Sequence, residues 1–277
     1  MPDYRLLALD IDGTLLDSSG QIRQDTCEAV ARLQRSGIDV MLVTGRHHIM
    51  ARPFQHQLAL QSAAICCNGA YVYDYASDQP VAHAALAPAQ AAQLLRWASE
   101  HELDLLLYID DALLTAQLNA HVLGLQTWAD QLPVALRPAI RLVSAGFAQE
   151  LALATHIWKV VVAHADTTVL TQALQSLPLA DKLSAEWSWH NRIDIVRAGN
   201  SKGARLAGYA ASRGISADQV VAVGDHQNDI SMLSWAGCGV AMGNASDAVK
   251  ASARRVTASN DEGGIAQLIN HLLSGVS

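Results

Sequence analysis

Aromatic and charged side chains are scarce in this chain of 277 residues. Aromatic residues make up 5% of it and charged residues 16%, whereas hydrophobic residues make up 51%. The interior is therefore expected to consist mainly of alanine, leucine, valine and isoleucine. This length is enough for about two domains of ordinary size.

The sequence also lacks an excess of basic residues and any long apolar run. Its net charge of −7 and its pI near 5.8 argue against nucleic acid or an anionic membrane as the main partner. No apolar run approaches the roughly 18 residues needed to span a bilayer. Asp3 and Asp10 leave no room for the apolar part of a signal peptide. We expect a cytoplasmic protein, either a monomer or a small homo-oligomer.

Cysteine is used without any metal-binding or redox spacing. Four cysteines are present and no C-x-x-C pair occurs, so we expect all four to be reduced and buried. The adjacent Cys66 and Cys67 are interpreted as part of a buried strand, because neighbouring side chains of a strand face opposite ways.

Apolar strands alternate with amphipathic helices along most of the chain, which predicts an α/β fold with a doubly wound parallel sheet. The middle is different, because it is rich in alanine, leucine and glutamine and contains several strand-like runs. We therefore predict an inserted α/β domain. The expected division is 1–82 for the first part of the core, 83–191 for the insertion and 192–277 for the second part of the core.

The first candidate functional motif is a pair of aspartates at the end of an apolar strand. The sequence LALDIDGT places Asp10 and Asp12 at the end of the predicted strand 5–10. Residues i and i+2 of an extended chain point to the same side. Two carboxylates on one side repel each other unless a cation or a shared proton relieves them. Taken alone, the pair could also be an acidic loop that caps neighbouring amides.

Three further stretches end strands or begin helices with polar residues. MLVTGR ends a strand on Thr44 and Gly45, and AGNSKGARL places Lys202 in the first turn of a helix. VVAVGDHQND ends a strand on Gly224-Asp225 and continues to Asn228-Asp229. In a doubly wound sheet, ligands collect beyond the carboxyl ends of the strands, so these stretches are expected to meet.

The types of residue in these stretches suit phosphate and magnesium. A hydroxyl group and free amides at a helix start can bind phosphate, and a lysine supplies a point charge for the same anion. The carboxylates of Asp10, Asp12 and Asp225 suit Mg²⁺, which prefers oxygen ligands. Each residue alone has an ordinary structural role, as a cap or a solvated side chain, but their arrangement at strand ends favours a site.

The four stretches resemble the four motifs of the haloacid dehalogenase-like phosphatases. The motifs are DxDGT at 10–14, VTGR at 43–46, NSKG at 200–203 and GDxxND at 224–229. The position of the insertion is similar to that in the Cof-type branch. Segments around VTGRHH, AICCNGAYVYDY and EWSWHNRIDIVRAGNSKG further resemble the enterobacterial pyridoxal phosphate phosphatases of this branch.

The resemblance implies a mechanism. Asp10 would form an aspartyl-phosphate, and Asp12 would act as general acid and base. Mg²⁺ would be bound by Asp10, Asp225 and the backbone carbonyl of Asp12, while Asp229 would orient Lys202 or a metal-bound water. The residues that would hold the phosphoryl oxygens are Thr44, Gly45, Lys202 and Asn228.

Several other residues are candidates for a rim that contacts the rest of the substrate. On the predicted strand around 187–190 the two tryptophans alternate, so their indoles are expected to share a face, either in a domain core or against substrate. The turn at Asp110-Asp111 is interpreted as structural. The His47-His48 pair is interpreted as a helix surface or as substrate rim. The rim candidates are His47, Asn68, Tyr71, Trp187, Trp189 and His190.

The leading hypothesis is a Mg²⁺-dependent phosphatase acting on a small phosphorylated metabolite, with pyridoxal 5′-phosphate as the favoured substrate. A broad sugar phosphate phosphatase and a sugar phosphomutase are the enzymatic alternatives. A phospho-receiver switch is the alternative that is not an enzyme, although receivers are about half this length and have no inserted domain.

Overall fold

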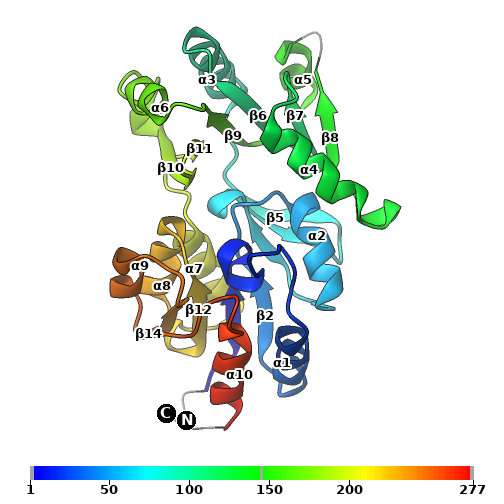
Figure 1. Ribbon diagram of the computed structural model, residues 1–277, viewed down its shortest axis with the longest axis vertical. Coiled ribbons are helices and arrows are strands. Elements are labelled where there is room, and N and C mark those ends of the chain that lie inside the picture. Colours follow the sequence, from blue (N-terminus) through cyan, green and yellow to red (C-terminus); the bar gives the residue numbers. More distant parts are fainter. Residues whose placement is uncertain (1–2, 144–145, 275–277) are drawn as a thin grey trace. The chain divides into compact units, whose positions relative to one another are not determined.

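The computed structural model describes residues 3–143 and 146–274 of the chain (Figure 1). The chain divides into two compact units, each of which contains its own large sheet. The first unit comprises Met1–Gly45, Phe54–Ala82 and Ser201–Ser277, and the second comprises Arg46–Pro53 and His83–Asn200. The predicted α/β class, with a parallel-sheet core and an inserted α/β unit, is confirmed.

A parallel sheet of five strands forms the centre of the first unit, in the order β14-β13-β12-β1-β2. Leu6 at the start of β1 lies opposite Asp39 on one side and Val220 on the other. Strand β1 therefore pairs with β2 on one side and with β12 on the other, which makes its carboxyl end a topological switch point. The strands are β1 (Leu6–Leu9), β2 (Asp39–Leu42), β12 (Val220–Gly224), β13 (Cys238–Ala241) and β14 (Arg255–Val256).

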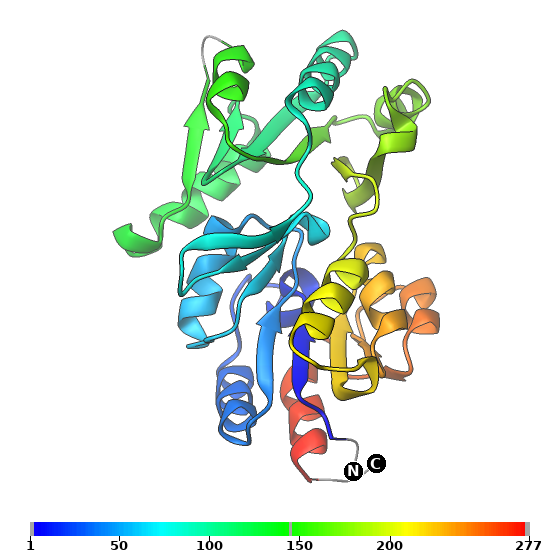
Figure 2. The ribbon, with the colours of Figure 1, turned by 180° about the vertical axis from the view of Figure 1, so that it is seen from behind.

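Helices cover this sheet in two groups, and Figures 1 and 2 show both. Helix α1 packs against α10, while α7 and α9 pack against α8. Leu6 and Ala8 of β1 belong to the same apolar cluster as Leu206 of α7 and Leu233 of α8. The helices are α1 (Gln24–Arg35), α7 (Lys202–Ser212), α8 (Ile230–Trp235), α9 (Asp247–Ser252) and α10 (Gly264–Ser274).

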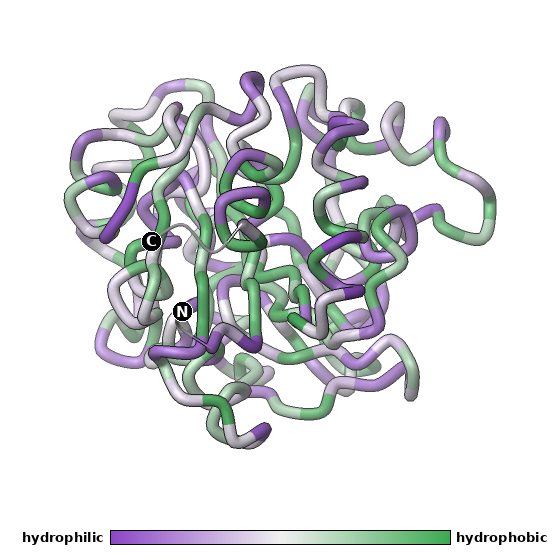
Figure 3. Tube along the Cα trace, turned by 90° about the horizontal axis from the view of Figure 1, so that it is seen from below, coloured by the Kyte–Doolittle hydropathy of each residue, from purple (hydrophilic) through white to green (hydrophobic). Residues whose placement is uncertain are grey.

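A smaller sheet follows the second strand of the core. It contains β3 (Ala64–Cys66), β4 (Tyr71–Asp74) and β5 (Gln79–His83) in that order. Before it, helix α2 (His48–Gln57) runs through Pro53. A single bridge between Val43 and Ile65 connects the end of the parallel sheet to β3. Figure 3 colours the chain trace by hydropathy, and apolar and polar segments alternate along it.

The second unit contains a sheet of six strands in the order β10-β11-β9-β6-β7-β8, antiparallel except between β7 and β8. One apolar cluster joins Leu94 of α3 to Leu107, Val160 and Ile195 of the sheet. The strands are β6 (Asp104–Ile109), β7 (Ala112–Thr115), β8 (Ala139–Leu142), β9 (Ile157–Ala163), β10 (Leu183–Trp189) and β11 (Arg192–Arg197). The helices are α3 (Pro88–Glu100), α4 (Ala120–Asp130), α5 (Ala148–Leu153) and α6 (Thr167–Leu174).

The second unit ends later than the sequence predicts. The expected return to the core at residue 192 is wrong, because β11 pairs with both β9 and β10 and so belongs to the six-stranded sheet. The boundary lies instead between Asn200 and Ser201. Asn200 Nδ2 donates to Ala84 O at 2.9 Å, which joins the segment that enters this unit to the segment that leaves it.

Two smaller expectations concern the cysteines and the membrane. Cys66, Cys67 and Cys238 are buried, but Cys27 is half-buried, because it lies near the start of helix α1 at the edge of the core. All four thiols are free. Among the residues that the structure describes, no helix combines the length and the apolar character needed to cross a bilayer.

Candidate active site

Three polar residues follow the carboxyl ends of adjacent core strands. Asp10 follows β1 and its amide donates to Val223 O at 3.0 Å, so its position is fixed by the neighbouring strand β12. Thr44 follows β2, and its amide donates to Ile65 O at 2.8 Å. Asp225 follows β12 directly. The expectation that the strand ends bring these residues to one edge of the sheet matches this arrangement.

Lys202 joins two carboxylates at the centre of this edge. Its Nζ donates to Asp10 Oδ1 and to Asp229 Oδ1, both at 2.6 Å. The side chains of Lys202, Asp10 and Asp229 are 1%, 6% and 0% exposed, so this interaction is almost free of solvent. Burial alone would lower the pKa of Lys202, but the two carboxylates raise it above the ordinary value. Lys202 is therefore a fixed positive charge.

Asp229 also holds the end of β12 in place. Its Oδ2 accepts hydrogen bonds from the amides of Asp225 at 2.9 Å and His226 at 3.0 Å. This close approach requires glycine at 224, because a Cβ there would lie 2.4 Å from Asp229 Cγ. Of the two roles expected for Asp229, orienting Lys202 is the one that the contacts match.

Negative charge is in excess at this site. Asp10, Asp225 and Asp229 each offer an oxygen, and these oxygens lie within 4.8 Å of one another. Three carboxylates and the one ammonium group of Lys202 leave two negative charges. Burial, and then the charge of Asp229, raise the pKa of Asp225 to about 7. Burial likewise raises the pKa of Asp10 well above its ordinary value, in spite of Lys202.

This donor set fits a divalent cation that prefers oxygen. The group offers carboxylate oxygens only, which suit Mg²⁺, Ca²⁺ or Mn²⁺ rather than softer metals. A divalent ion would neutralise the two excess charges and lower the raised pKa values of the carboxylates. The side chains present therefore fit a magnesium ion.

Asp12 differs from Asp10 in its exposure. Its side chain is exposed, whereas Asp10 is buried, and its carboxylate is not in the close group of three. The chain leaves β1 at Leu9 and turns through Ile11–Leu15, where Asp12 and Gly13 have non-helical backbone angles and Gly13 has a φ of 76°. Beside the larger effect of burial, the charge of Asp12 raises the pKa of both Asp10 and Asp225, so its carboxylate lies near both.

The four residues expected to hold phosphate lie near the same strand ends. Thr44 is buried, and Thr44 O accepts from the amide of Asn68 at 3.1 Å. A Cβ at residue 45 would lie 2.8 Å from Asn68 Oδ1, so Gly45 permits this close approach. Asn228 Nδ2 donates to Asn68 Oδ1 at 3.1 Å. Within the described part of the chain, Asn228 Oδ1 is buried and has no hydrogen-bond partner.

Comparison with known proteins gives the family. The model of the haloacid dehalogenase-like hydrolases matches residues 7–269. The chain is 42% identical over 270 residues to the pyridoxal phosphate phosphatase of Escherichia coli K12, covering 97% of this chain and 99% of the relative. It is 30% identical to the 5-amino-6-(5-phospho-D-ribitylamino)uracil phosphatase YitU of Bacillus subtilis, covering 97% of each chain. The chain belongs to the haloacid dehalogenase-like hydrolases.

A solved structure agrees with this assignment. A haloacid dehalogenase-like hydrolase from Bacteroides thetaiotaomicron superposes with a TM-score of 0.85 at 26% identity, covering 97% of this chain and 99% of that one. The resemblance inferred from the four motifs is thus confirmed. This haloacid dehalogenase-like hydrolase is an enzyme of the phosphatase kind, and the receiver-switch alternative is wrong.

Some residues that shape the site of this hydrolase were missed by the sequence analysis. Thr14 Oγ1 donates to Asp225 Oδ1 at 2.9 Å, and Asn244 Nδ2 donates to Gly13 O at 2.9 Å. Ser231 Oγ accepts from the amide of Gly203 at 3.0 Å at the start of α7. Thr14 could have been identified from the sequence, because it ends the DxDGT motif. Asn244 could not, because it lies in a loop with no strand-end motif.

The residues proposed as a substrate rim divide into buried and exposed ones. His47 is fully buried, so the helix-surface interpretation is wrong; its Nε2 lies 3.2 Å from Ile109 O, and burial lowers its pKa well below the ordinary value. Asn68 and Tyr71 are also buried. The Asp110 carboxylate accepts from the amides of Thr155 and His156, both at 2.9 Å, which fits the structural interpretation of that turn.

The two tryptophans do not share a face. The register of β10 against β11 shifts between Trp187 and Trp189, so the strict alternation assumed from the sequence is broken there. Trp187 packs against the apolar cluster of the second unit, whereas Trp189 is 57% exposed. His190 is exposed as well. Trp189 and His190 are thus the only two of the six rim candidates, all of them in the described chain, that are exposed.

Proposed function

We propose that this enzyme is a Mg²⁺-dependent phosphatase that hydrolyses pyridoxal 5′-phosphate through an aspartyl-phosphate intermediate. The observation that carries the proposal is the buried contact of Lys202 with both Asp10 and Asp229, next to Asp225. A carboxylate at a strand end, a fixed ammonium group and a site for a divalent cation are the parts that phosphoryl transfer requires.

Magnesium is the proposed cofactor. The side chains of Asp10 and Asp225 and the backbone carbonyl of Asp12 would bind it, and Thr14 would hold Asp225 in place through its hydrogen bond. When bound, Mg²⁺ would neutralise charge that develops on the transferring phosphoryl group. Asp229 is already engaged by Lys202 and by two backbone amides, so we assign it a positioning role.

Asp10 is the proposed nucleophile. A carboxylate oxygen of Asp10 would form a bond to phosphorus while the bond from phosphorus to the ester oxygen breaks. Asp12 would donate its proton to the departing alkoxide, so that an alcohol is released. Lys202 keeps Asp10 oriented throughout, because its ammonium group binds Oδ1 from a buried position.

The second half of the reaction would return the enzyme to its starting state. Water would attack the phosphorus of the aspartyl-phosphate, and Asp12, now deprotonated, would take up its proton. The bond between Asp10 and phosphorus would break, and inorganic phosphate would leave. The exposed position of Asp12 supports this role, because the group that exchanges protons with substrate and water has to be accessible.

Thr44, the amide of Gly45, Lys202 and Asn228 are the proposed ligands of the phosphoryl oxygens. Asn228 Nδ2 donates one hydrogen bond to Asn68 Oδ1. The second N–H of this amide group would donate to a phosphoryl oxygen.

Pyridoxal 5′-phosphate is favoured as substrate by the relative that is 42% identical over nearly the whole chain. A flat pyridine ring would also gain roughly 0.5–1.5 kcal/mol from an aromatic neighbour beyond area burial, and Trp189 is the exposed aromatic candidate. A second candidate is a broader phosphatase of small sugar-like esters, since the relative at 30% identity is named for a ribityl phosphate substrate.

The test is a comparison of kcat/KM with Mg²⁺ across pyridoxal 5′-phosphate, hexose and tetrose phosphates, the ribitylaminouracil phosphate and p-nitrophenyl phosphate. We expect pyridoxal 5′-phosphate to rank among the best. If its kcat/KM lies about a hundredfold below that of the sugar phosphates, the substrate proposal fails while the phosphatase survives. If no ester is hydrolysed, the proposed reaction itself fails.

A further inference from the structure

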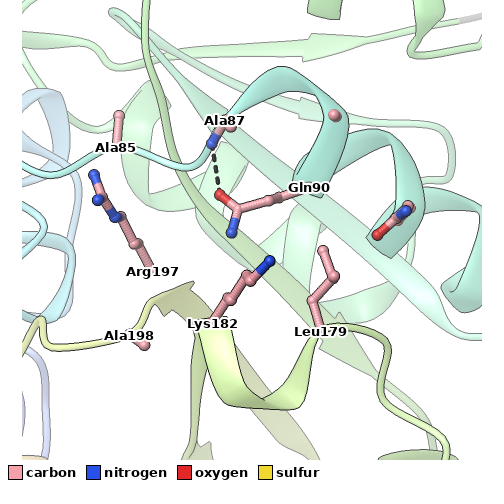
Figure 4. A pocket seen from close by; sticks show the side chains of 9 residues that line it. Ala85, Ala87, Gln90, Leu179, Lys182, Arg197 and Ala198 are labelled. Atoms are coloured by element: carbon pink, nitrogen blue, oxygen red, sulfur yellow. Dashed lines mark hydrogen bonds between the residues drawn. The ribbon is translucent and has the colours of Figure 1, made fainter.

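A cavity of about 710 Å³ lies within the second unit (Figure 4). Its walls come from the first turns of α3, from the turn before β10 and from the end of β11. Its volume is in the range that small organic ligands occupy in proteins. None of the residues that line it belongs to the active site described above, so this cavity requires its own explanation.

Two cations face this cavity without an acidic partner. Lys182 and Arg197 both line it, and Figure 4 shows the Lys182 side chain directed toward Gln90 and the Arg197 side chain toward Ala85. Within the part of the chain that the structure describes, neither side chain forms a hydrogen bond or an ion pair. Two unpaired cations at one cavity favour an anion, all the more in a chain whose net charge is −7.

The start of α3 does not by itself provide this anion site. Gln90 Oε1 accepts a hydrogen bond from the amide of Ala87 at 2.8 Å, so a side chain of the protein already caps this end of the helix. Figure 4 shows this bond. An acidic group in the cavity would therefore be bound by Lys182 and Arg197, through charge-assisted hydrogen bonds.

A third polar group at the cavity is a hydrogen-bond acceptor that lacks a donor. Gln93 lines the cavity, and its Oε1 is buried without a hydrogen-bond partner. A buried acceptor without a donor is costly and is found only rarely in proteins. Gln93 Oε1 needs a hydrogen-bond donor, such as an N–H or O–H group. Neither Lys182 nor Arg197 donates to it in the structure.

The remaining walls are apolar. They consist of alanines and of Leu179, whose φ of 56° and ψ of 34° place it in the left-handed region. This backbone conformation is uncommon for a leucine, and such strain is concentrated at turns and ligand-binding segments. The amide of Lys182 donates to Leu179 O at 2.8 Å, so the strained turn presents both side chains to the cavity.

We infer that this cavity binds a small organic anion with an apolar body and a hydrogen-bond donor. Lys182 and Arg197 bind its acidic group, which is a carboxylate or a phosphate. Leu179 and the alanines contact its body, and Gln93 Oε1 accepts its donor. This site is separate from the one for the proposed phosphatase reaction, and the inference does not depend on that reaction.

The test uses a series of probes with one indole body. Indole-3-acetate carries a carboxylate, indol-3-ylmethylphosphonate carries a phosphonate, and 3-methylindole carries no charge. Calorimetric titration of the full chain should show saturable binding of one or both anions, with a dissociation constant of about 1 mM for fragments of this size. The uncharged probe should not bind. Which anion binds more tightly assigns the acidic group.

Matched variants link that binding to the cavity. Lys182→Gln and Arg197→Gln should each weaken binding by about tenfold, whereas Lys250→Gln on α9 of the first unit should leave it unchanged. Ala89→Phe should block binding by filling the cavity without a change of charge. 1-Naphthylacetate, which lacks the N–H donor, should bind more weakly than indole-3-acetate if Gln93 is engaged.

The inference is overturned if the wild-type chain binds neither anion, or if Lys182→Gln, Arg197→Gln and Ala89→Phe all bind as the wild type does. Hydrolysis of p-nitrophenyl phosphate serves as the check on folding. We expect it to be unchanged in these variants, because none of the altered residues lies in the active site. A variant that loses both binding and hydrolysis is replaced by Lys182→Met or Arg197→Met, for which the same two outcomes apply.

Discussion

Lys202 and Asp10 are 192 positions apart in the sequence, yet Lys202 Nζ lies 2.6 Å from Asp10 Oδ1. The ammonium group lies equally close to Asp229 Oδ1. The proposed nucleophile is thus held by a charge that also holds the end of strand β12, through Asp229. The proposed nucleophile and the stability of the metal-free protein are therefore coupled through one side chain.

Removing that side chain should destabilise the fold. Lys202→Met leaves Asp10 and Asp229 buried without their ammonium partner, which typically costs about 3–5 kcal/mol. The measurement is the free energy of unfolding in urea without magnesium, and Lys250→Met is the control, with little change expected. A loss below about 1 kcal/mol would show that the two carboxylates are relieved in another way, for instance by protonation.

Substitution of the two aspartates of the first motif should impair different steps of the reaction. Asp10→Asn should abolish both turnover and the phosphoenzyme, because an amide is a poor nucleophile. Asp12→Asn retains the nucleophile and should slow turnover by about 10²–10⁴-fold, the usual contribution of a general acid or base. Acid-quenched enzyme after a pulse of ³²P-labelled substrate measures the intermediate. Turnover near the wild-type rate in Asp10→Asn would contradict the assignment.

Magnesium affinity should depend on pH near neutrality. The pKa of Asp225 is raised to about 7 by burial and by Asp229, and a ligand has to lose its proton before it binds metal. Below this pKa the apparent affinity should fall by up to about tenfold per pH unit, and above it the affinity should level off. Chelation should abolish activity, and Ca²⁺ should restore it poorly, because Ca²⁺ favours more ligands at longer distances.

The raised pKa of Asp225 also predicts how the stability of the metal-free protein changes with pH. A carboxyl group whose pKa is higher in the folded chain stabilises the metal-free fold fully only below its unfolded pKa of 3.8, and this contribution is lost as the pH rises from there to about 7. Mg²⁺ should therefore raise the melting temperature more at about pH 8 than at about pH 6. Asp225→Asn is the control and should lose most of this difference. An equal rise at both pH values would argue against Asp225 as a ligand.

A pair of glycines separates steric effects at the metal site from backbone strain. Gly13 and Gly20 both have a φ of 76°. A Cβ at 13 would lie 2.3 Å from Asp225 Oδ2, whereas a Cβ at 20 has nothing within 4 Å. Both Gly→Ala variants should lose about 1 kcal/mol of stability through the backbone, and Gly13→Ala should lose more, because its Cβ would displace the Asp225 carboxylate. Only Gly13→Ala should weaken magnesium binding, as titration calorimetry would measure; equal affinity in both variants would contradict this.

The two tryptophans of β10 offer a test of the second unit. Trp187 packs against the apolar cluster, so Trp187→Ala should lower the free energy of unfolding by about 2–3 kcal/mol. Trp189 is 57% exposed, so Trp189→Ala should stay within about 0.5 kcal/mol of the wild type. Urea unfolding followed by circular dichroism makes the comparison. Equal losses would mean that both indoles are packed, as the simple alternation of a strand predicts.

Sequence reasoning placed the strand ends well, because a buried parallel strand has a clear pattern and its carboxyl end is where ligands bind. Asp10, Thr44 and Asp225 follow directly from that rule. It was less successful wherever the chain leaves regular structure. The turn at Ile11–Leu15 leaves Asp12 exposed while Asp10 is buried, and the register shift at Trp187 separates the two indoles. Such features depend on contacts with distant strands, and local periodicity does not record them.

The end of the second unit was misplaced for a related reason. Residues 192–197 could form a strand of either unit, and only their pairing with β9 and β10 assigns them to the second unit. The helix-surface interpretation of His47 was wrong because local sequence does not show what covers a side chain. Its burial depends on Ile109, which is 62 positions away.

The hydrogen bond from Asn200 to Ala84 has an evolutionary meaning. It joins two segments that are 116 positions apart in the sequence, so the insertion begins and ends at nearly the same point. A gene segment with such adjacent ends can be exchanged, lengthened or shortened by recombination without stretching the host fold, as is general for insertions with neighbouring termini. A change of length or sequence within the insertion therefore leaves the strands of the host fold, and the carboxylates at their ends, in place.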